Sequence, residues 1–150
     1  MGTQVEAVIA ALKLQLSHIR TANGYRTDIG ALIHLHSAQR GQHELPSIAI
    51  GMRTGRLNRT NETMNGKQLS QKARSVDFTI EAAHAADVEE AERIALDMLE
   101  DIETAMARRT GLAPYGTSEV TLETWQILDR PEGVDGVVLQ ILGTAGYLRT

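Results

Sequence analysis

The chain has 150 residues, no cysteine and a formal net charge of −4. This length predicts one domain, which can bury enough surface to fold without disulfides. The lack of cysteine excludes thiolate chemistry and Cys-based metal sites. One Trp, one Phe and three Tyr are few rings for a nucleic-acid-binding surface, and the net charge has the wrong sign for one. No apolar run approaches the roughly 20 residues that span a bilayer, and the first residues make a poor signal peptide.

The first third of the chain predicts a helix followed by two strands. The helix is expected over residues 3–20, because apolar residues recur there at three- and four-residue spacing: Val5, Val8, Ile9, Leu12, Leu16 and Ile19. Gly24 is expected to end it, since Gly tolerates the left-handed conformation that often follows a helix. Strands are predicted at about 29–37 and, after Pro46, at about 47–54, and residues 55–66 are predicted to form a loop.

Residues 67–106 predict a long strand that leads directly into an acidic amphipathic helix. In the strand, Val76, Phe78, Ile80 and Ala82 alternate with polar residues, the period expected of a half-buried strand. The helix is predicted over about 88–109, with Asp87 as its N-cap and with Gly111 and Pro114 ending it. Its apolar stripe comprises Val88, Ala91, Ala95, Met98, Ile102 and Ala105, widened by Ile94, Leu99 and Met106.

Two more strands are predicted at the end of the chain. In residues 119–129, alternation places Val120, Leu122 and Leu128 on one face and Glu123, Trp125 and Ile127 on the other. After a turn at 131–136, residues 137–148 begin apolar on both faces, which indicates a strand that is central in the sheet or covered on both faces. The predicted order is α-β-β-β-α-β-β. It indicates an α+β fold with a largely antiparallel or mixed sheet of about five strands and two helices on one face, as a single domain over 1–150.

No catalytic motif is present, and neither a G-x-S-x-G nor a phosphate-binding glycine loop occurs. His34 and His36 share one face of a predicted strand, with His43 nearby in the sequence, but a third metal ligand is not evident. Structural or surface histidines are therefore favoured over a metal site. We assign no catalytic, cofactor-binding or metal residue and expect a protein that is not an enzyme. A small metal-dependent enzyme using these histidines is a remote alternative.

Charge is segregated along the chain. Residues 53–74 contain one acid, Glu62, and six basic residues: Arg53, Arg56, Arg59, Lys67, Lys72 and Arg74. Residues 87–103 contain eight acids and one base, Arg93. Copies in a ring could place the basic stretch of one subunit beside the acidic helix of the next. Two other interpretations stay open, namely that both stretches are solvated surfaces or that the basic one faces DNA.

The order of segments resembles a known family. The opening VEAVIAALKLQLSHI and TANGYRTDIG, the strand in LPSIAIGM and the unit KARSVDFTIEAAHAADVEEAERIALDMLEDIETAM precede two C-terminal strands. With these segments the chain resembles the tail terminator, or tail-completion, proteins of long-tailed bacteriophages over nearly its whole length. The resemblance rests on the order of the elements and on similarity within short segments. It includes no invariant motif from which individual functional residues could be assigned.

The resemblance implies a structural virion protein. Such proteins form a hexameric ring that caps the head-proximal end of the tail tube, ends its polymerisation and offers a surface for head joining. Partners would be further copies of the chain, the tail tube protein and a neck or head-completion protein. Genomic DNA would pass through the lumen without sequence-specific binding, and no membrane is involved. The protein would reside in the virion and, during assembly, in the host cytoplasm.

The charged residues are candidates for contacts to a neighbouring subunit, the tube or the lumen. They are the six basic residues above together with Glu89, Glu92, Glu100 and Glu103. A neighbouring head–tail connector or a tail tube-like protein is the main alternative, because related small α+β folds occur in those positions too.

Overall fold

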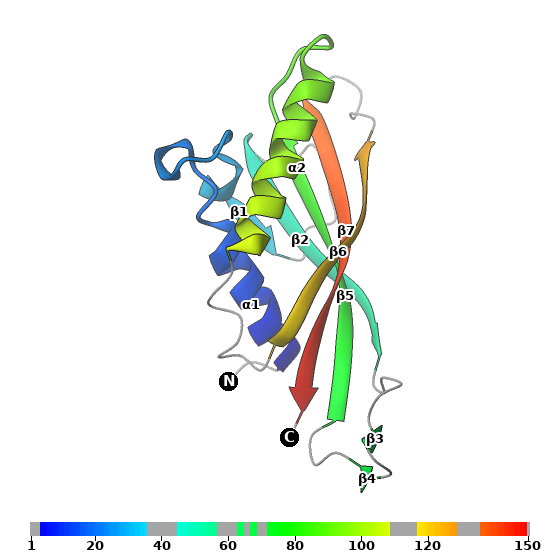
Figure 1. Ribbon diagram of the computed structural model, residues 1–150. Helices are drawn as coiled ribbons and strands as arrows, with labels where there is room; N and C mark the ends of the chain where they lie inside the picture. Colours follow the sequence, from blue (N-terminus) through cyan, green and yellow to red (C-terminus); the bar gives the residue numbers. More distant parts are fainter. Residues whose placement is uncertain are drawn as a thin grey trace.

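Two helices cover one face of a five-stranded sheet in the computed structural model (Figure 1). The structure describes residues 4–35, 45–56, 63–64, 67–68, 72–108, 117–128 and 136–149. The sheet order is β1-β2-β5-β7-β6, comprising β1 (Ile33–Leu35), β2 (Ser47–Arg56), β5 (Lys72–His84), β7 (Val137–Arg149) and β6 (Thr117–Leu128). β1 pairs with β2 in parallel and every other pairing in this sheet is antiparallel. The predicted α+β class with a mixed five-stranded sheet is confirmed. A separate two-stranded sheet joins β3 (Thr63–Met64) to β4 (Lys67–Gln68), inside the predicted loop and just after it.

The first helix, α1 (Gln4–Leu16), is shorter than predicted. Gly24 adopts the predicted left-handed conformation, with φ of 90°, but it closes a 3₁₀ turn over Thr21–Asn23 instead of ending α1. Residues Ile29–Ala31 form a second 3₁₀ turn where a strand was predicted. The Ala31 N–H donates to the Asp28 carbonyl oxygen at 3.0 Å in this turn, and Gly30 packs so closely on the end of α1 that a Cβ there would overlap the carbonyl oxygens of Leu16 and Ile19.

The second helix, α2 (Ala91–Ala107), begins three residues later than predicted. Asp87 Oδ1 accepts a hydrogen bond of 2.9 Å from the Glu90 backbone N–H, so it holds the turn that precedes the helix. Val88 lies in that turn with 79% of its surface exposed, and its predicted place in the apolar stripe is wrong. The rest of the stripe is confirmed, with Ala91, Ile94 and Leu99 partly buried and the others fully buried: Ala95, Met98, Ile102, Ala105 and Met106.

The core lies between the two helices and the sheet. In β5 the predicted alternation is confirmed, with buried side chains at Val76, Phe78, Ile80 and Ala82. The buried residues of α1 meet them from one helix: Val8, Ile9, Leu12 and Leu16. The start of β7, the strand between β5 and β6, is buried on both faces. Val137 and Leu139 are buried on the helix-covered face, and Val138 on the helix-free face is only 5% exposed. Burying such aliphatic side chains contributes roughly 1.5–3 kcal/mol each.

The predicted faces of β6 are wrong beyond Leu122. The pairing with β7 shifts by one residue between Leu122 and Thr124, which marks a β-bulge. Leu122 pairs with Gly143 and Trp125 pairs with Ile141, and directly paired residues of antiparallel strands share a face. Trp125 and Ile127 therefore join Leu122 on the helix-covered face, whereas Leu128 lies on the other. A strict period of two cannot foresee the extra residue that a bulge inserts.

Gly143 is the position on β7 opposite the bulge. A Cβ at this position would lie 2.6 Å from Phe78 Cζ and 2.7 Å from the Thr121 carbonyl oxygen. Both distances are shorter than any real Cβ contact, so the close packing here requires glycine.

One buried carboxylate ties α2 to the segment after α1. Asp101 is 2% exposed, and its oxygens accept hydrogen bonds from the backbone N–H groups of Arg26 (3.0 Å) and Thr27 (2.8 Å) and from the Thr27 hydroxyl. We call Asp101, Arg26 and Thr27 the Asp101 cluster. A second tie joins the helices directly, because Gln15 Nε2 donates to the Ala105 carbonyl oxygen at 2.8 Å. These bonds satisfy polar groups that burial would otherwise leave destabilising.

Candidate assembly interface

Strand pairing gathers basic residues at one end of the sheet. Arg56 pairs with Ser75 at the end of β2, Arg74 pairs with Tyr147, and Lys72 pairs with Arg149. Arg53 is the extra residue where the β2 register shifts between Met52 and Thr54. We call this region the basic sheet end, comprising Arg53, Arg56, Lys72, Arg74 and Arg149.

The structure thus brings together four of the six basic residues that the sequence singled out. Lys67 lies on β4, which Figure 1 shows at the same end of the molecule, and Arg59 lies outside the described residues. Arg149 was missed, because nothing in the sequence signals that the last strand pairs with the first residues of β5. The backbone register alone reveals it.

The predicted acidic residues form an exposed surface on and before α2. Glu92, Glu100 and Glu103 are exposed on the helix, and Glu89 is exposed in the turn before it. Arg93 pairs with Glu90 (3.6 Å) and with Asp97 (3.8 Å), which Arg26 also approaches (3.5 Å). Such surface ion pairs stabilise a fold only weakly. Within the described part of the chain, Glu92, Glu100 and Glu103 make no ion pair, so their charge faces solvent.

The two charged surfaces are separated within one subunit. β5 runs from the basic sheet end to the other end of the molecule, where the chain turns and α2 runs back across the sheet (Figure 1). Lys72 at the start of β5 and Glu92 in the first turn of α2 therefore lie at opposite ends. Two different patches on one subunit are the arrangement that a heterologous contact between copies uses.

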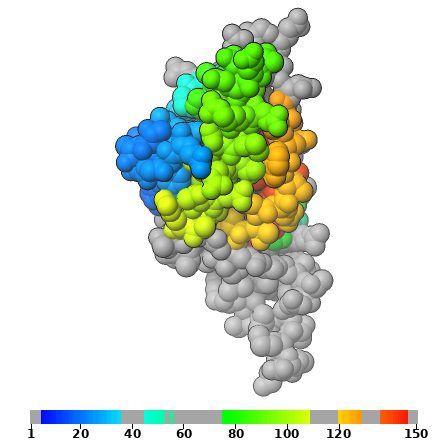
Figure 2. Space-filling model, turned by 45° about the horizontal axis from the view of Figure 1, so that its top comes forward, coloured from blue at the N-terminus to red at the C-terminus, as the bar shows by residue number. Residues whose placement is uncertain are grey.

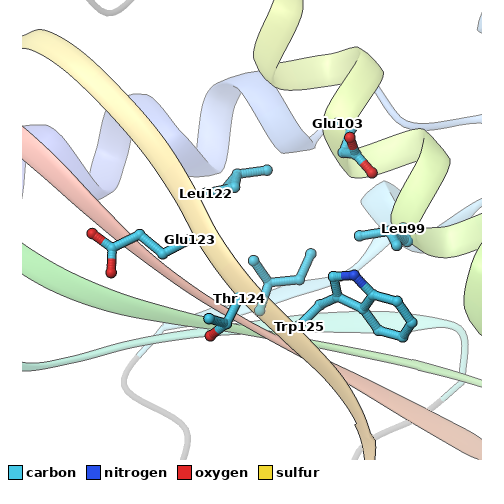
Figure 3. A pocket seen from close by; sticks show the side chains of 7 residues that line it. Leu99, Glu103, Leu122, Glu123, Thr124 and Trp125 are labelled. Carbon is cyan, nitrogen blue, oxygen red and sulfur yellow. The ribbon is translucent and has the colours of Figure 1, made fainter.

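A groove of about 290 Å³ lies between α2 and the edge strand β6. Leu99 and Glu103 border it from α2, Leu122 and Trp125 from β6, and Ile141 forms its floor, with Glu123 and Thr124 at its margin. Figure 3 shows Leu99 and Trp125 near each other across it. Trp125 is 50% exposed, unusual for so large an apolar side chain. We call this feature the Trp125 groove. Figure 2 shows α2 flanked by the N-terminal segment on one side and by β6 on the other.

The side chains of Glu103 and Glu123, the two acids of the groove, point in different directions. The Glu103 side chain projects from α2 on the groove side, whereas Glu123 points away from Trp125 (Figure 3). Glu123 is held there by Thr144, whose hydroxyl lies 2.9 Å from Glu123 Oε1 and 3.1 Å from Asp77 Oδ1. That single hydroxyl proton serves one carboxylate at a time. Of these two carboxylates, the one from Glu103 lies on the Trp125 side of the groove.

Within the described residues, the alternative of a histidine metal site gains no further ligand. His34 lies on β1, and both His36 and His43 lie outside the described residues. Among the residues that the structure describes, no three His, Cys, Asp or Glu side chains are placed to hold a metal ion. In the same part of the chain, neither helix is long and apolar enough to cross a membrane.

Comparisons of the chain with models of known protein families and with curated proteins find no match. The resemblance to tail terminators therefore rests on the segments quoted above and on the order of elements. A fold of this general kind does not define a function.

Proposed function

We propose that this protein is a structural ring protein that caps the head-proximal end of a phage tail tube, ends its polymerisation and offers the head-joining surface. The observation that carries the proposal is the placement of the basic sheet end and the acidic surface of α2 at separate places on one subunit. Contact between two different patches is heterologous, and heterologous contacts generate rings when the rotation between subunits closes. The family that the chain resembles uses a hexamer.

The fold and the far face of the sheet also support the proposal. The confirmed order of helices and strands is the layout that the resemblance implies. The helix-free face carries the exposed carboxylates of Asp77 and Glu123. Carboxylates repel phosphates, so a ring with this face toward its lumen would let DNA pass without adhering. The proposed partners are further copies, the tail tube protein and a neck or head-completion protein, and no catalytic step is involved.

A neighbouring connector or a tail tube-like protein is the competing assignment, and localisation separates the three. Electron microscopy of particles that contain the labelled chain should place it between the tail tube and the head. Particles that lack it should have tails of uncontrolled length that do not join heads. Labelled capsids in the absence of tails would favour the connector, and label along the tube would favour a tube protein. Label at the baseplate would exclude all three.

Charge reversal tests whether the basic stretch serves assembly. Replacing Arg53, Arg56 and Arg59 together by Glu should prevent incorporation into particles while leaving the melting temperature of the isolated chain nearly unchanged. Replacing the same residues by Lys is the matched control, because it keeps the charge, and should leave assembly largely intact. If the Glu variant unfolds, the basic stretch stabilises the fold and the proposal loses its main support.

A further inference from the structure

We propose that the Trp125 groove is the acceptor for the basic sheet end of a second copy of this chain. This inference rests on the proposed head-to-tail assembly and names the two surfaces that meet. The groove and the basic sheet end lie on different parts of the subunit, so one copy can use both at once, its groove toward one neighbour and its basic end toward the other.

The groove has the chemistry that recognises a long basic side chain. Leu99, Leu122 and Ile141 offer apolar walls for the aliphatic stem of an Arg or Lys side chain. The half-exposed ring of Trp125 offers a face for the cation, and Trp is the strongest aromatic partner for cations. The Glu103 carboxylate, which pairs with no base in the described part of the chain, offers a charge-assisted hydrogen bond to the same group.

Charge complementarity within this one sequence points to a second copy as the occupant. The basic sheet end has five basic residues on three neighbouring strands. The groove lies beside α2, whose exposed acids Glu92, Glu100 and Glu103 give this side of the subunit the opposite sign. The groove also lies along β6, which is the sheet edge and leaves backbone groups for a neighbour to contact. Trp at the centre of an interface is a frequent hot spot.

The single tryptophan of the chain makes the groove directly observable, because all tryptophan fluorescence comes from Trp125. The test uses two full-length variants that are each defective on one side. In the first, Lys72→Glu and Arg74→Glu reverse two of the five charges of the basic sheet end but keep the groove and its fluorescence. In the second, Trp125→Ala removes the groove and the fluorescence but keeps the basic sheet end.

Mixing the two variants should produce one productive contact. Titrating the Trp125→Ala chain into the Lys72→Glu, Arg74→Glu chain should shift the tryptophan emission to shorter wavelength, as Trp125 leaves water. High salt should reverse the shift, because charge attraction is screened. The control titrant combines all three substitutions and should cause no shift. No shift with the first titrant, or an equal shift with the control, would overturn the proposal. Should the Glu variant fail to fold, Lys72→Gln with Arg74→Gln replaces it.

This experiment and the localisation experiment fail independently. A protein found at the head-proximal end of the tail whose Trp125 does not respond has the proposed function with a different interface. A protein whose Trp125 responds as expected, but which is located elsewhere, assembles head-to-tail in another role.

Discussion

The Asp101 cluster and the Trp125 groove both use residues of α2. They differ because the first buries a charged side chain and the second exposes an apolar one. The Asp101 cluster places a carboxylate in the interior, 2% exposed and satisfied by three hydrogen bonds. The Trp125 groove, bordered by Leu99 and Glu103 of the same helix, leaves a large apolar ring half exposed. A polar group where apolar packing is expected, and an apolar group where polar surface is expected, both call for an explanation.

The two side chains differ in whether the same subunit supplies all of their contacts. Asp101 has its partners in the same chain, so it stabilises the fold. Trp125 has walls on part of its surface and water on the rest, so its remaining apolar area gains from a partner. A buried polar group whose hydrogen bonds are all made within the subunit therefore stabilises the fold. A large apolar side chain that is only partly covered indicates a surface for contact with a partner. The following substitutions test this division, beginning with the one expected to have the largest effect.

Replacing Asp101 by Ala should destabilise the chain by about 3 kcal/mol, because it leaves the buried Thr27 N–H and hydroxyl and the part-buried Arg26 N–H without their acceptor. Urea unfolding at neutral pH measures this. The matched control is Glu100→Ala, the preceding residue on the exposed side of the helix, with an expected change within about 0.5 kcal/mol. Equal effects for the two variants would show that the Asp101 cluster does not tie the fold together.

Replacing Gly143 by Ala should cost about 2 kcal/mol, since the new methyl group overlaps Phe78 and the Thr121 carbonyl oxygen. Because Gly143 lies opposite the bulge, the substitution should also change the fluorescence of Trp125. The control is Gly51→Ala in β2, where a Cβ meets nothing within 4 Å, and its unfolding curve should nearly match the parent. A fully stable Gly143→Ala chain would mean that the bulge tolerates a side chain.

Replacing Trp125 by Ala should lower stability by less than about 1 kcal/mol, well below the 3–5 kcal/mol typical of a buried Trp, because half of the ring already faces water. Its effect on self-association, measured by light scattering, should be much larger. Val88→Ala changes a more exposed apolar residue outside the groove and should affect neither property. A large loss of stability in the Trp125→Ala variant would show that Trp125 stabilises the fold of the subunit and is not mainly a contact residue.

The smallest effect is expected at Asp28, an exposed carboxylate in the segment that Asp101 holds. Hydrogen bonds from the Thr21 backbone N–H (2.8 Å) and hydroxyl (3.0 Å) lower the pKa of Asp28 below its ordinary 3.8. Because the folded-state pKa is depressed, the stabilisation is present above the ordinary pKa and is lost as pH falls through the lowered value. Asp28→Asn should therefore be slightly less stable than the parent at pH 7, and the difference should vanish in strong acid. A difference that grows on acidification would contradict this sign.

Local periodicity predicted the elements well where one face of an element packs on one neighbour. The stripe of α1, the stripe of α2 apart from Val88, and the alternation of β5 were read correctly, because burial on one face imposes a period of 3.6 or 2 on the sequence. Errors arose where a neighbour altered the local geometry. The segment around Gly30, which packs closely on the end of α1, forms a 3₁₀ turn where a strand was predicted, and the bulge in β6 moved Trp125 to the other face.

The sequence by itself determined the α+β class, the two helices and the separation of basic from acidic stretches. Only the tertiary structure decided which distant residues share a surface. It added Arg149 to the basic sheet end, satisfied Asp101 with backbone groups that precede it by more than seventy residues, and placed Trp125 beside α2. The physical reason is that hydrophobic periodicity is a local consequence of burial, whereas strand register and bulges depend on pairing between segments far apart in the chain.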